Sequence, residues 1–140
     1  LHLAGHLTML GFRVECPIAN PVALTAASND YGYDVALARQ IHSMPAGANV
    51  TNALVVLSCS GNSRNVTGLI KLFKSVGERY RPTIIALTGN IADPNYSELE
   101  ADISLKVASD HYGVIEDVHS VAIHIIRQLL TDMGLTEPAR

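Results

Sequence analysis

Cysteine is scarce in this chain, which carries only Cys16 and Cys59 among its 140 residues. Two cysteines are too few for a disulfide scaffold, and their separation does not match the spacing of metal-binding cysteines. We therefore expect a reducing, cytoplasmic setting rather than a disulfide-rich secreted fold.

Clusters of basic side chains and long apolar runs are also lacking. The chain has 10 Lys and Arg against 13 Asp and Glu, for a net charge of −3. This balance disfavours the basic surface that binds nucleic acid. No apolar run approaches the ~20 residues of a membrane-spanning helix, and no basic segment with a following apolar stretch marks a signal peptide. We expect no nucleic-acid partner and no membrane partner.

Apolar side chains are abundant at 48%, whereas charged ones make up 16%. A chain of this length and composition predicts one folded domain over residues 1–140. Because the chain starts with Leu1 and is helical in pattern from its first residue, we expect that its true N-terminus lies upstream.

Hydrophobic periodicity predicts an alternation of helices and strands. The expected helices are 1–10, 33–44 (ended by the turn residues 45–49), 65–78 and 114–133. The expected strands are 21–27, 53–58, 82–89 and 102–107, the last three of them buried. This order predicts an α/β fold with a doubly wound parallel sheet flanked by helices. The segment 90–101 is the expected mobile loop. In the last helix, six apolar residues are expected to face the core: Ile115, Val118, Ala122, Ile125, Ile126 and Leu129.

The segment "SCSGNS" at residues 58–63 lies where a buried strand gives way to a helix. Ligands of open α/β sheets bind beyond the carboxyl ends of the strands. The unpaired N–H groups of a helix start attract anions, and small hydroxyl side chains add donors. The pattern favours a phosphate-type site over the alternative, in which Ser60 or Asn62 only caps the helix.

Three stretches carry a resemblance to a known family. "LSCSGNSRNV" at 57–66 resembles the phosphate loop of sugar isomerase (SIS) domains. "SNDYGYD" at 28–34 and "IIALTG" at 84–89 are similar to segments of the phosphoheptose isomerases. The resemblance covers nearly all of the chain and implies a three-layer, flavodoxin-like SIS fold. The family's first helix and its Gly/Ser-rich loop would precede Leu1.

The resemblance also implies binding roles for residues of these stretches. It places phosphate-binding groups at Ser58, Cys59, Ser60 and Ser63. Cys59 stands where the family has threonine, so that a weak thiol donor replaces a hydroxyl. The pair Asn29 and Asp30 matches the residues that hydrogen-bond the sugar.

Histidines form a second pattern of interest. His2 and His6 are four residues apart in the first helix and so share a face. In the last helix Glu116, Ser120, His124 and Gln128 form a polar stripe at four-residue spacing. From the residues alone, these histidines are either solvated surface residues or part of a zinc site.

The resemblance to the phosphoheptose isomerases implies that zinc is bound by His2, His6, Glu116 and His124. His6 stands where the family has glutamate, and Glu116 where it has glutamine. The family's acid/base pair falls on His6 and His124, with Glu116 as an alternative base and substrate contact. His119 could replace either helix partner, whereas Arg127 is expected on a solvated helix face.

The resulting hypothesis is a metal-assisted aldose–ketose isomerase acting on a phosphorylated sugar, sedoheptulose 7-phosphate. The first alternative is a catalytically inactive SIS module that binds a phosphosugar or docks onto a partner protein. A second alternative is isomerisation of a different phosphosugar. The resemblance further implies a homo-oligomer, a tetramer with its sites at subunit boundaries.

Overall fold

Three parallel strands form the centre of the structure, a computed structural model that describes residues 1–42, 52–75, 81–90 and 99–135. They lie in the order β1-β2-β3. The strands are β1 (Ala53–Ser58), β2 (Thr83–Thr88) and β3 (Ile103–Lys106). The helices are α1 (His2–Met9), α2 (Pro21–Tyr31), α3 (Tyr33–His42), α4 (Arg64–Ser75), α5 (Tyr112–Asp132) and the short 3-10 helix η1 (Pro17–Ala19).

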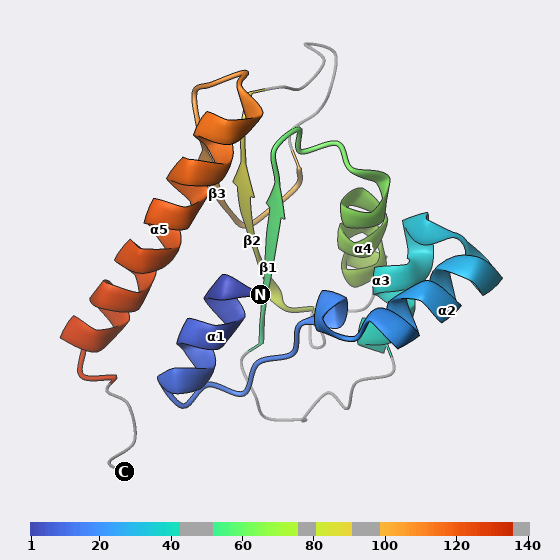
Figure 1. The fold of residues 1–140 in the computed structure, drawn as a ribbon, viewed down its shortest axis with the longest axis horizontal. Coiled ribbons are helices and arrows are strands. Elements are labelled where there is room, and N and C mark those ends of the chain that lie inside the picture. Colours follow the sequence, from blue (N-terminus) through green and yellow to red (C-terminus); the bar gives the residue numbers. More distant parts are fainter. Residues whose placement is uncertain (43–51, 76–80, 91–98, 136–140) are drawn as a thin grey trace.

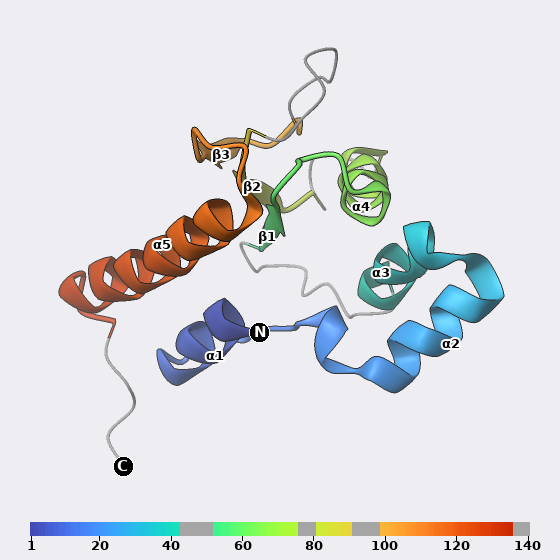
Figure 2. The ribbon, with the colours of Figure 1, turned by 45° about the horizontal axis from the view of Figure 1, so that its top comes forward.

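Helices cover both faces of this sheet (Figure 1). Figure 2 shows α4 on one face and α5 on the other, with α1 beside α5 and with α3 and α2 outside α4. The predicted α/β class, with a parallel sheet between helical layers, is therefore confirmed. The turn expected at 45–49 and positions 91–98 of the expected mobile loop lie outside the described residues.

The register of the strands brings their carboxyl ends level with one another. Ser58 at the end of β1 pairs with Thr88 at the end of β2, and Thr88 pairs with Lys106 at the end of β3. Because the strands are parallel, the segments that follow them leave from the same edge of the sheet. This edge positions the "SCSGNS" segment.

The strand expected at 21–27 is wrong, because this segment forms the first part of α2. Asn20 accepts the backbone N–H of Ala23 at 3.1 Å on its side chain, and Pro21 occupies the first helical position. An Asn cap followed by Pro is a strong helix start, and the alanines of the segment are good helix formers. The helix ends at Gly32, whose φ of 88° lies in the left-handed region.

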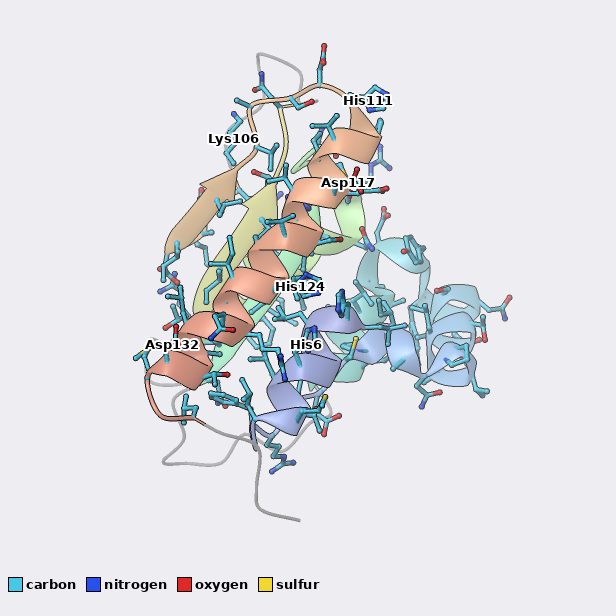
Figure 3. All side chains as sticks on the ribbon, turned by 60° about the vertical axis from the view of Figure 1, so that its left-hand side comes forward. His6, Lys106, His111, Asp117, His124 and Asp132 are labelled. Atoms are coloured by element: carbon cyan, nitrogen blue, oxygen red, sulfur yellow. The ribbon has the colours of Figure 1, made fainter. Side chains whose placement is uncertain are left out.

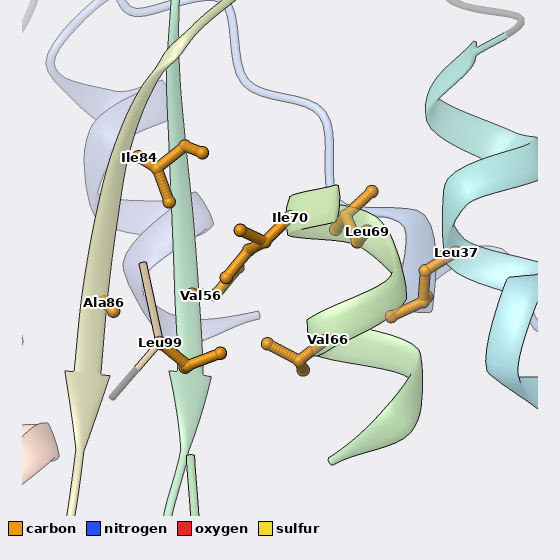
Figure 4. Packing of buried hydrophobic residues seen from close by; sticks show 8 residues of the cluster. All are labelled: Leu37, Val56, Val66, Leu69, Ile70, Ile84, Ala86 and Leu99. Carbon is orange, nitrogen blue, oxygen red and sulfur yellow. The ribbon is translucent and has the colours of Figure 1, made fainter. Parts of the chain in front are cut away.

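The main core lies between the sheet and α4 (Figure 4). Its buried side chains come from β1, β2, α3, α4 and the segment before β3: Leu37, Val56, Val66, Leu69, Ile70, Ile84, Ala86 and Leu99. Ile84 and Ala86 alternate with Leu87, which is also buried and by strand alternation faces the side of α5. The central strand is thus buried on both faces, as its unbroken apolar sequence predicts.

Two expectations about burial are wrong for the single chain. Every residue of β3, which lies at one edge of the described sheet, is exposed. In α5 the buried residues are Ile115, His119, Ala122 and Ile123. Three residues that were expected to face the core are exposed instead: Val118, Ile125 and Leu129. None of the described helices combines the length and apolar character that crossing a membrane requires.

Candidate functional site

The serine loop, residues 58–63, connects the end of β1 to the start of α4. Ser58 is buried, and its Oγ accepts the backbone N–H of Gly61 at 3.1 Å and lies 3.1 Å from Ser63 Oγ. Gly61 has a φ of 67°, a conformation that glycine adopts without strain. The loop therefore turns back on itself and brings Ser58 and Ser63, two of the predicted phosphate-binding residues, together.

Ser60 and Ser63 have different tasks in this turn. Ser60 Oγ accepts the N–H of Asn62 at 3.1 Å, a bond within the loop. The carbonyl of Ser63 accepts the N–H groups of Val66 and Thr67, both at 2.9 Å, and so opens α4. Ser60 shapes the loop instead of capping the helix. The start of α4, with its partial positive charge, therefore faces the same small cradle of hydroxyls.

Cys59 sits half-buried in the serine loop, with its carbonyl accepting the N–H of Gly89 at 3.0 Å. Burial raises the pKa of its thiol, and the negative charge of Glu116 on α5 raises it further. The sulfur is therefore a protonated thiol at neutral pH, a weak donor rather than a nucleophilic thiolate. The same coupling shows that Glu116 lies close enough to the loop to influence its electrostatics.

Three imidazoles, those of His2, His6 and His124, meet where α1 faces α5. Figure 3 shows His6 on α1 beside His124 on α5. The Nε2 atoms of His2 and His6 are 2.9 Å apart, and those of His2 and His124 are 3.3 Å apart. The spacing of four residues places the two α1 rings on one face of that helix. The structure thus brings together three of the four predicted metal ligands, although His124 is 118 positions from His6 in the sequence.

The donor set of this histidine cluster fits a divalent metal. The ligand nitrogens all lie within 4.8 Å of one another, and two of the rings are exposed. Zinc with bonds of 2.0–2.1 Å in a tetrahedral arrangement holds its nitrogens about 3.4 Å apart. The observed separations of 2.9 and 3.3 Å are close to that value. Three histidines with a fourth position left open are a typical donor set of catalytic zinc.

The electrostatics of the cluster keep His6 neutral. Desolvation lowers the pKa of His6 from its ordinary value, and the charges of His2, Arg127 and His124 lower it further. A neutral imidazole is the form that binds metal. Arg127, expected on a solvated helix face, is half-buried and acts on the cluster. Its position three residues after His124 could have indicated this, because residues three apart on a helix are neighbours.

Glu116 and His119, the other candidates on α5, lie outside the histidine cluster. Glu116 is exposed and precedes His124 by eight residues, which is about 12 Å along a helix. It lies toward the serine loop, whose Cys59 it influences. His119 is buried and its Nε2 lies 3.3 Å from the carbonyl oxygen of Thr88. The expectation that His119 could join the cluster is therefore wrong.

Asn29 and Asp30 are exposed near the end of α2, and their side chains form a hydrogen bond of 3.4 Å. Beyond them, Asp34 in the first turn of α3 lies 3.9 Å from Arg64 in the first turn of α4. The start of α3 therefore lies beside the start of α4, the helix that the serine loop opens.

Comparison with known proteins identifies the family. No protein-family model matches the chain. A protein of Thermoplasma acidophilum named "Probable phosphoheptose isomerase" is 32% identical over 139 residues, which cover 94% of this chain and 70% of that protein. The chain belongs to the phosphoheptose isomerase family. The phosphoheptose isomerase of Vibrio cholerae is 37% identical over 116 residues, or 81% of this chain.

The fold agrees with this membership. A solved phosphoheptose isomerase of Neisseria gonorrhoeae superposes with a TM-score of 0.76 and 27% identity, covering 92% of this chain and 67% of that one. The SIS-type α/β fold is therefore confirmed. The chain nevertheless spans only about half of the Vibrio cholerae relative, 55% of its length. These phosphoheptose isomerases are thus longer than this chain.

Proposed function

We propose that this chain is a metal-assisted sugar-phosphate isomerase that converts sedoheptulose 7-phosphate to an aldose heptose 7-phosphate. Family membership supports an isomerase of phosphorylated sugars. The observation that carries the proposal is the meeting of three imidazoles from α1 and α5 within 4.8 Å, in the molecule that also holds the serine loop. The histidine cluster suits catalysis at a carbonyl group, and the serine loop suits binding of an anion.

The phosphate is bound by the serine loop. Ser58, Ser60 and Ser63 offer hydroxyls, Cys59 offers a thiol, and the start of α4 adds backbone N–H groups and a favourable dipole. Asn29 and Asp30 hydrogen-bond the sugar hydroxyls. Binding at the phosphate end fixes the substrate, so that its carbonyl end is oriented for reaction.

Zinc is the metal proposed for the histidine cluster, where His2, His6 and His124 would hold it and leave a fourth position open for the substrate. Glu116, the fourth ligand that the family resemblance implies, lies outside this cluster and is left free to act as a base. A divalent metal there supplies a Lewis acid that polarises the substrate carbonyl. The lowered pKa of His6 supports this role, because the imidazole needs no deprotonation near neutral pH.

Proton transfer needs a base beside the carbon that is to lose its hydrogen. His6 and His124 match the family's acid/base pair, but a ring nitrogen that binds metal has no lone pair left for a proton. We therefore assign the transfer to Glu116. Its carboxylate takes the proton from the hydroxyl-bearing carbon next to the carbonyl and returns it to the former carbonyl carbon. The hydroxyl proton moves to the other oxygen.

The test is turnover of sedoheptulose 7-phosphate by the purified chain, with added zinc and after chelation. His124→Ala should remove both zinc binding and turnover, and Glu116→Gln should lower kcat by at least about 100-fold while zinc still binds. His111→Ala is the matched control, because His111 is an exposed histidine at the start of α5 outside the cluster. Unchanged turnover in His124→Ala would rule out the metal-assisted scheme.

One observation favours the alternative of a catalytically inactive phosphosugar-binding module. The negative charge of Glu116 acts on the serine loop, where a phosphate would have to bind, and Cys59 supplies only a thiol there. Such a module would bind sedoheptulose 7-phosphate calorimetrically, yet show no turnover with any added divalent metal. A screen of five- to seven-carbon sugar phosphates separates this outcome from isomerisation of a different phosphosugar.

We further propose a cytoplasmic homo-oligomer, a tetramer by family resemblance. The apolar stripe of α5 supports an assembly, because five large side chains along one helix are left exposed: Val114, Val118, Val121, Ile125 and Leu129. Contiguous exposed apolar surface of this kind is typical of protein interfaces.

A further inference from the structure

His119 is a buried titratable side chain that the proposed reaction does not use. It lies on α5 with 4% of its surface exposed, among the buried apolar residues Ile115, Ala122 and Ile123. An imidazole is a costly choice for such a position, since a leucine would fill it without a polar group to satisfy. The imidazole also forms a hydrogen bond, and the position of its partner suggests a reason for a polar side chain at this site.

The partner of His119 is the carbonyl of Thr88, the last residue of β2. His119 Nε2 lies 3.3 Å from this oxygen, which also accepts the N–H of Val107 at 2.8 Å. Thr88 pairs with Ser58, the first residue of the serine loop. One carbonyl therefore joins α5, the end of the central strand and the segment after β3, at the level where the loop begins.

The residue after Thr88 supports the serine loop directly. The N–H of Gly89 is donated to the carbonyl of Cys59 at 3.0 Å. A Cβ at position 89 would lie 2.2 Å from Ile115 Cδ1, so that α5 and this backbone are in close contact. Ile115 and His119 are one turn apart on α5, so they contact Gly89 and Thr88 from the same face of the helix.

The same helix carries His124 of the histidine cluster. His124 lies five positions after His119, which is about 7.5 Å along the helix axis. Apolar contacts are non-directional and allow a helix to slide or rotate, whereas a hydrogen bond loses strength when its angle and length change. The bond from His119 thus adds a directional constraint on α5 at the end of β2.

We infer that His119 is a positioning residue that sets the placement of the histidine cluster relative to the serine loop. This inference rests on the proposed function, in which the loop binds phosphate and the cluster serves the chemistry. It predicts that loss of the bond lowers kcat and leaves the affinity for phosphate unchanged. A side chain with only a packing role would affect stability without this split.

The experiment compares His119→Leu with His119→Gln in the full chain. Leucine keeps the volume without the donor, and the glutamine amide can donate to the Thr88 carbonyl. In His119→Leu we expect kcat to fall between about tenfold and 100-fold, the cost of a displacement of about 1 Å at a reaction centre. The inhibition constant of inorganic phosphate should not change. His119→Gln should recover most of kcat, whereas Ile123→Val, a packing control on α5, should lower Tm alone.

Equal kcat values for wild type and His119→Leu would overturn the inference, as would a loss that glutamine does not recover. If the wild-type chain turns over no sugar phosphate, it is the proposed function that fails. The inference is then decided by crystal structures of the two variants. A shift of His124 relative to Ser58 in the leucine variant alone supports it, and an unmoved α5 overturns it.

Discussion

At the scale of single residues, the most informative position is Cys59. It occupies the serine loop where the resemblance expects a threonine, and it is held as a neutral thiol by burial and by Glu116. A thiol donates a weaker hydrogen bond than a hydroxyl does. The loop keeps its serines but offers one fewer strong donor to an anion.

Cys59→Thr should therefore strengthen phosphate binding. One additional hydrogen bond to a charged group contributes about 1.5 kcal/mol or more, so the affinity for inorganic phosphate should rise about tenfold. The inhibition constant of phosphate, or calorimetry where turnover is absent, measures this change. Cys16→Ser is the matched control, because Cys16 lies just before η1, outside the loop. An unchanged affinity in Cys59→Thr would contradict the placement of this side chain at the anion.

Four residues of the candidate site could be assigned to the loop from the sequence because they lie within one six-residue segment, 58–63. The histidine cluster could be assigned only in part. The spacing of His2 and His6 shows that they share a helix face, but no local pattern shows that His124 meets them. The position of Arg127 beside them depends on how α5 is rotated, which local sequence does not determine.

At the scale of elements, α5 and the end of β2 approach each other most closely at Gly89. Among the described glycines, this is the one where an added Cβ would meet its neighbours at the shortest distance. Gly89 admits no Cβ, because one would meet Ile115 Cδ1 at 2.2 Å and the carbonyl of Cys59 at 2.8 Å. A side chain at this position must push α5 or the serine loop away. The glycine after β2 therefore allows the close approach of α5 and the serine loop to this backbone.

Gly89→Ala should lower the free energy of unfolding by about 1–3 kcal/mol, the usual cost of overpacking. Urea denaturation measures this loss, and the pairing with Ile115→Ala should recover part of it because the clashing atom is removed. Gly5→Ala on α1 is the contrasting variant, since nothing lies within 4 Å of a Cβ there. It should raise the free energy of unfolding by up to about 1 kcal/mol through helix propensity. Equal free energies of unfolding for Gly89→Ala and wild type would show that α5 is not closely packed against Gly89.

Element type was predictable where one period dominates the sequence. The apolar runs of β1 and β2 are short and rich in β-branched residues, which favours strands, and the long periodic segment of α5 favours a helix. Residues 21–27 have two interpretations, because "PVALTAA" suits a short strand as well as a helix. The Asn20 cap and Pro21 decide in favour of the helix, and the segment then continues to Tyr31.

At the scale of the whole molecule, the apolar stripe of α5 is left without cover in the single chain. Val121, Ile125 and Leu129 are each more than half exposed. Ile103 and Leu105 on β3 are exposed as well. The proposed homo-oligomer gives this surface a partner.

Val121→Asp should therefore shift the chain toward the monomer, because a charge would be buried in the interface without a partner. Light scattering on a sizing column measures the mass of the particle. Val22→Asp is the matched control, because Val22 is 77% exposed on α2, away from the stripe. If Val121→Asp keeps the mass of wild type, this face of α5 is not the interface.

The sequence by itself determined the order of most elements, the α/β class and the serine loop, because periodicity, caps and a contiguous motif are properties of neighbouring residues. Only the tertiary structure decided which side chains from distant segments meet. It placed His124 beside His2 and His6, left Glu116 with the loop, and turned His119 inward to Thr88. The physical reason is that the rotation and height of a packed helix are set by its contacts with the sheet, at Gly89 and Thr88, and not by its own pattern.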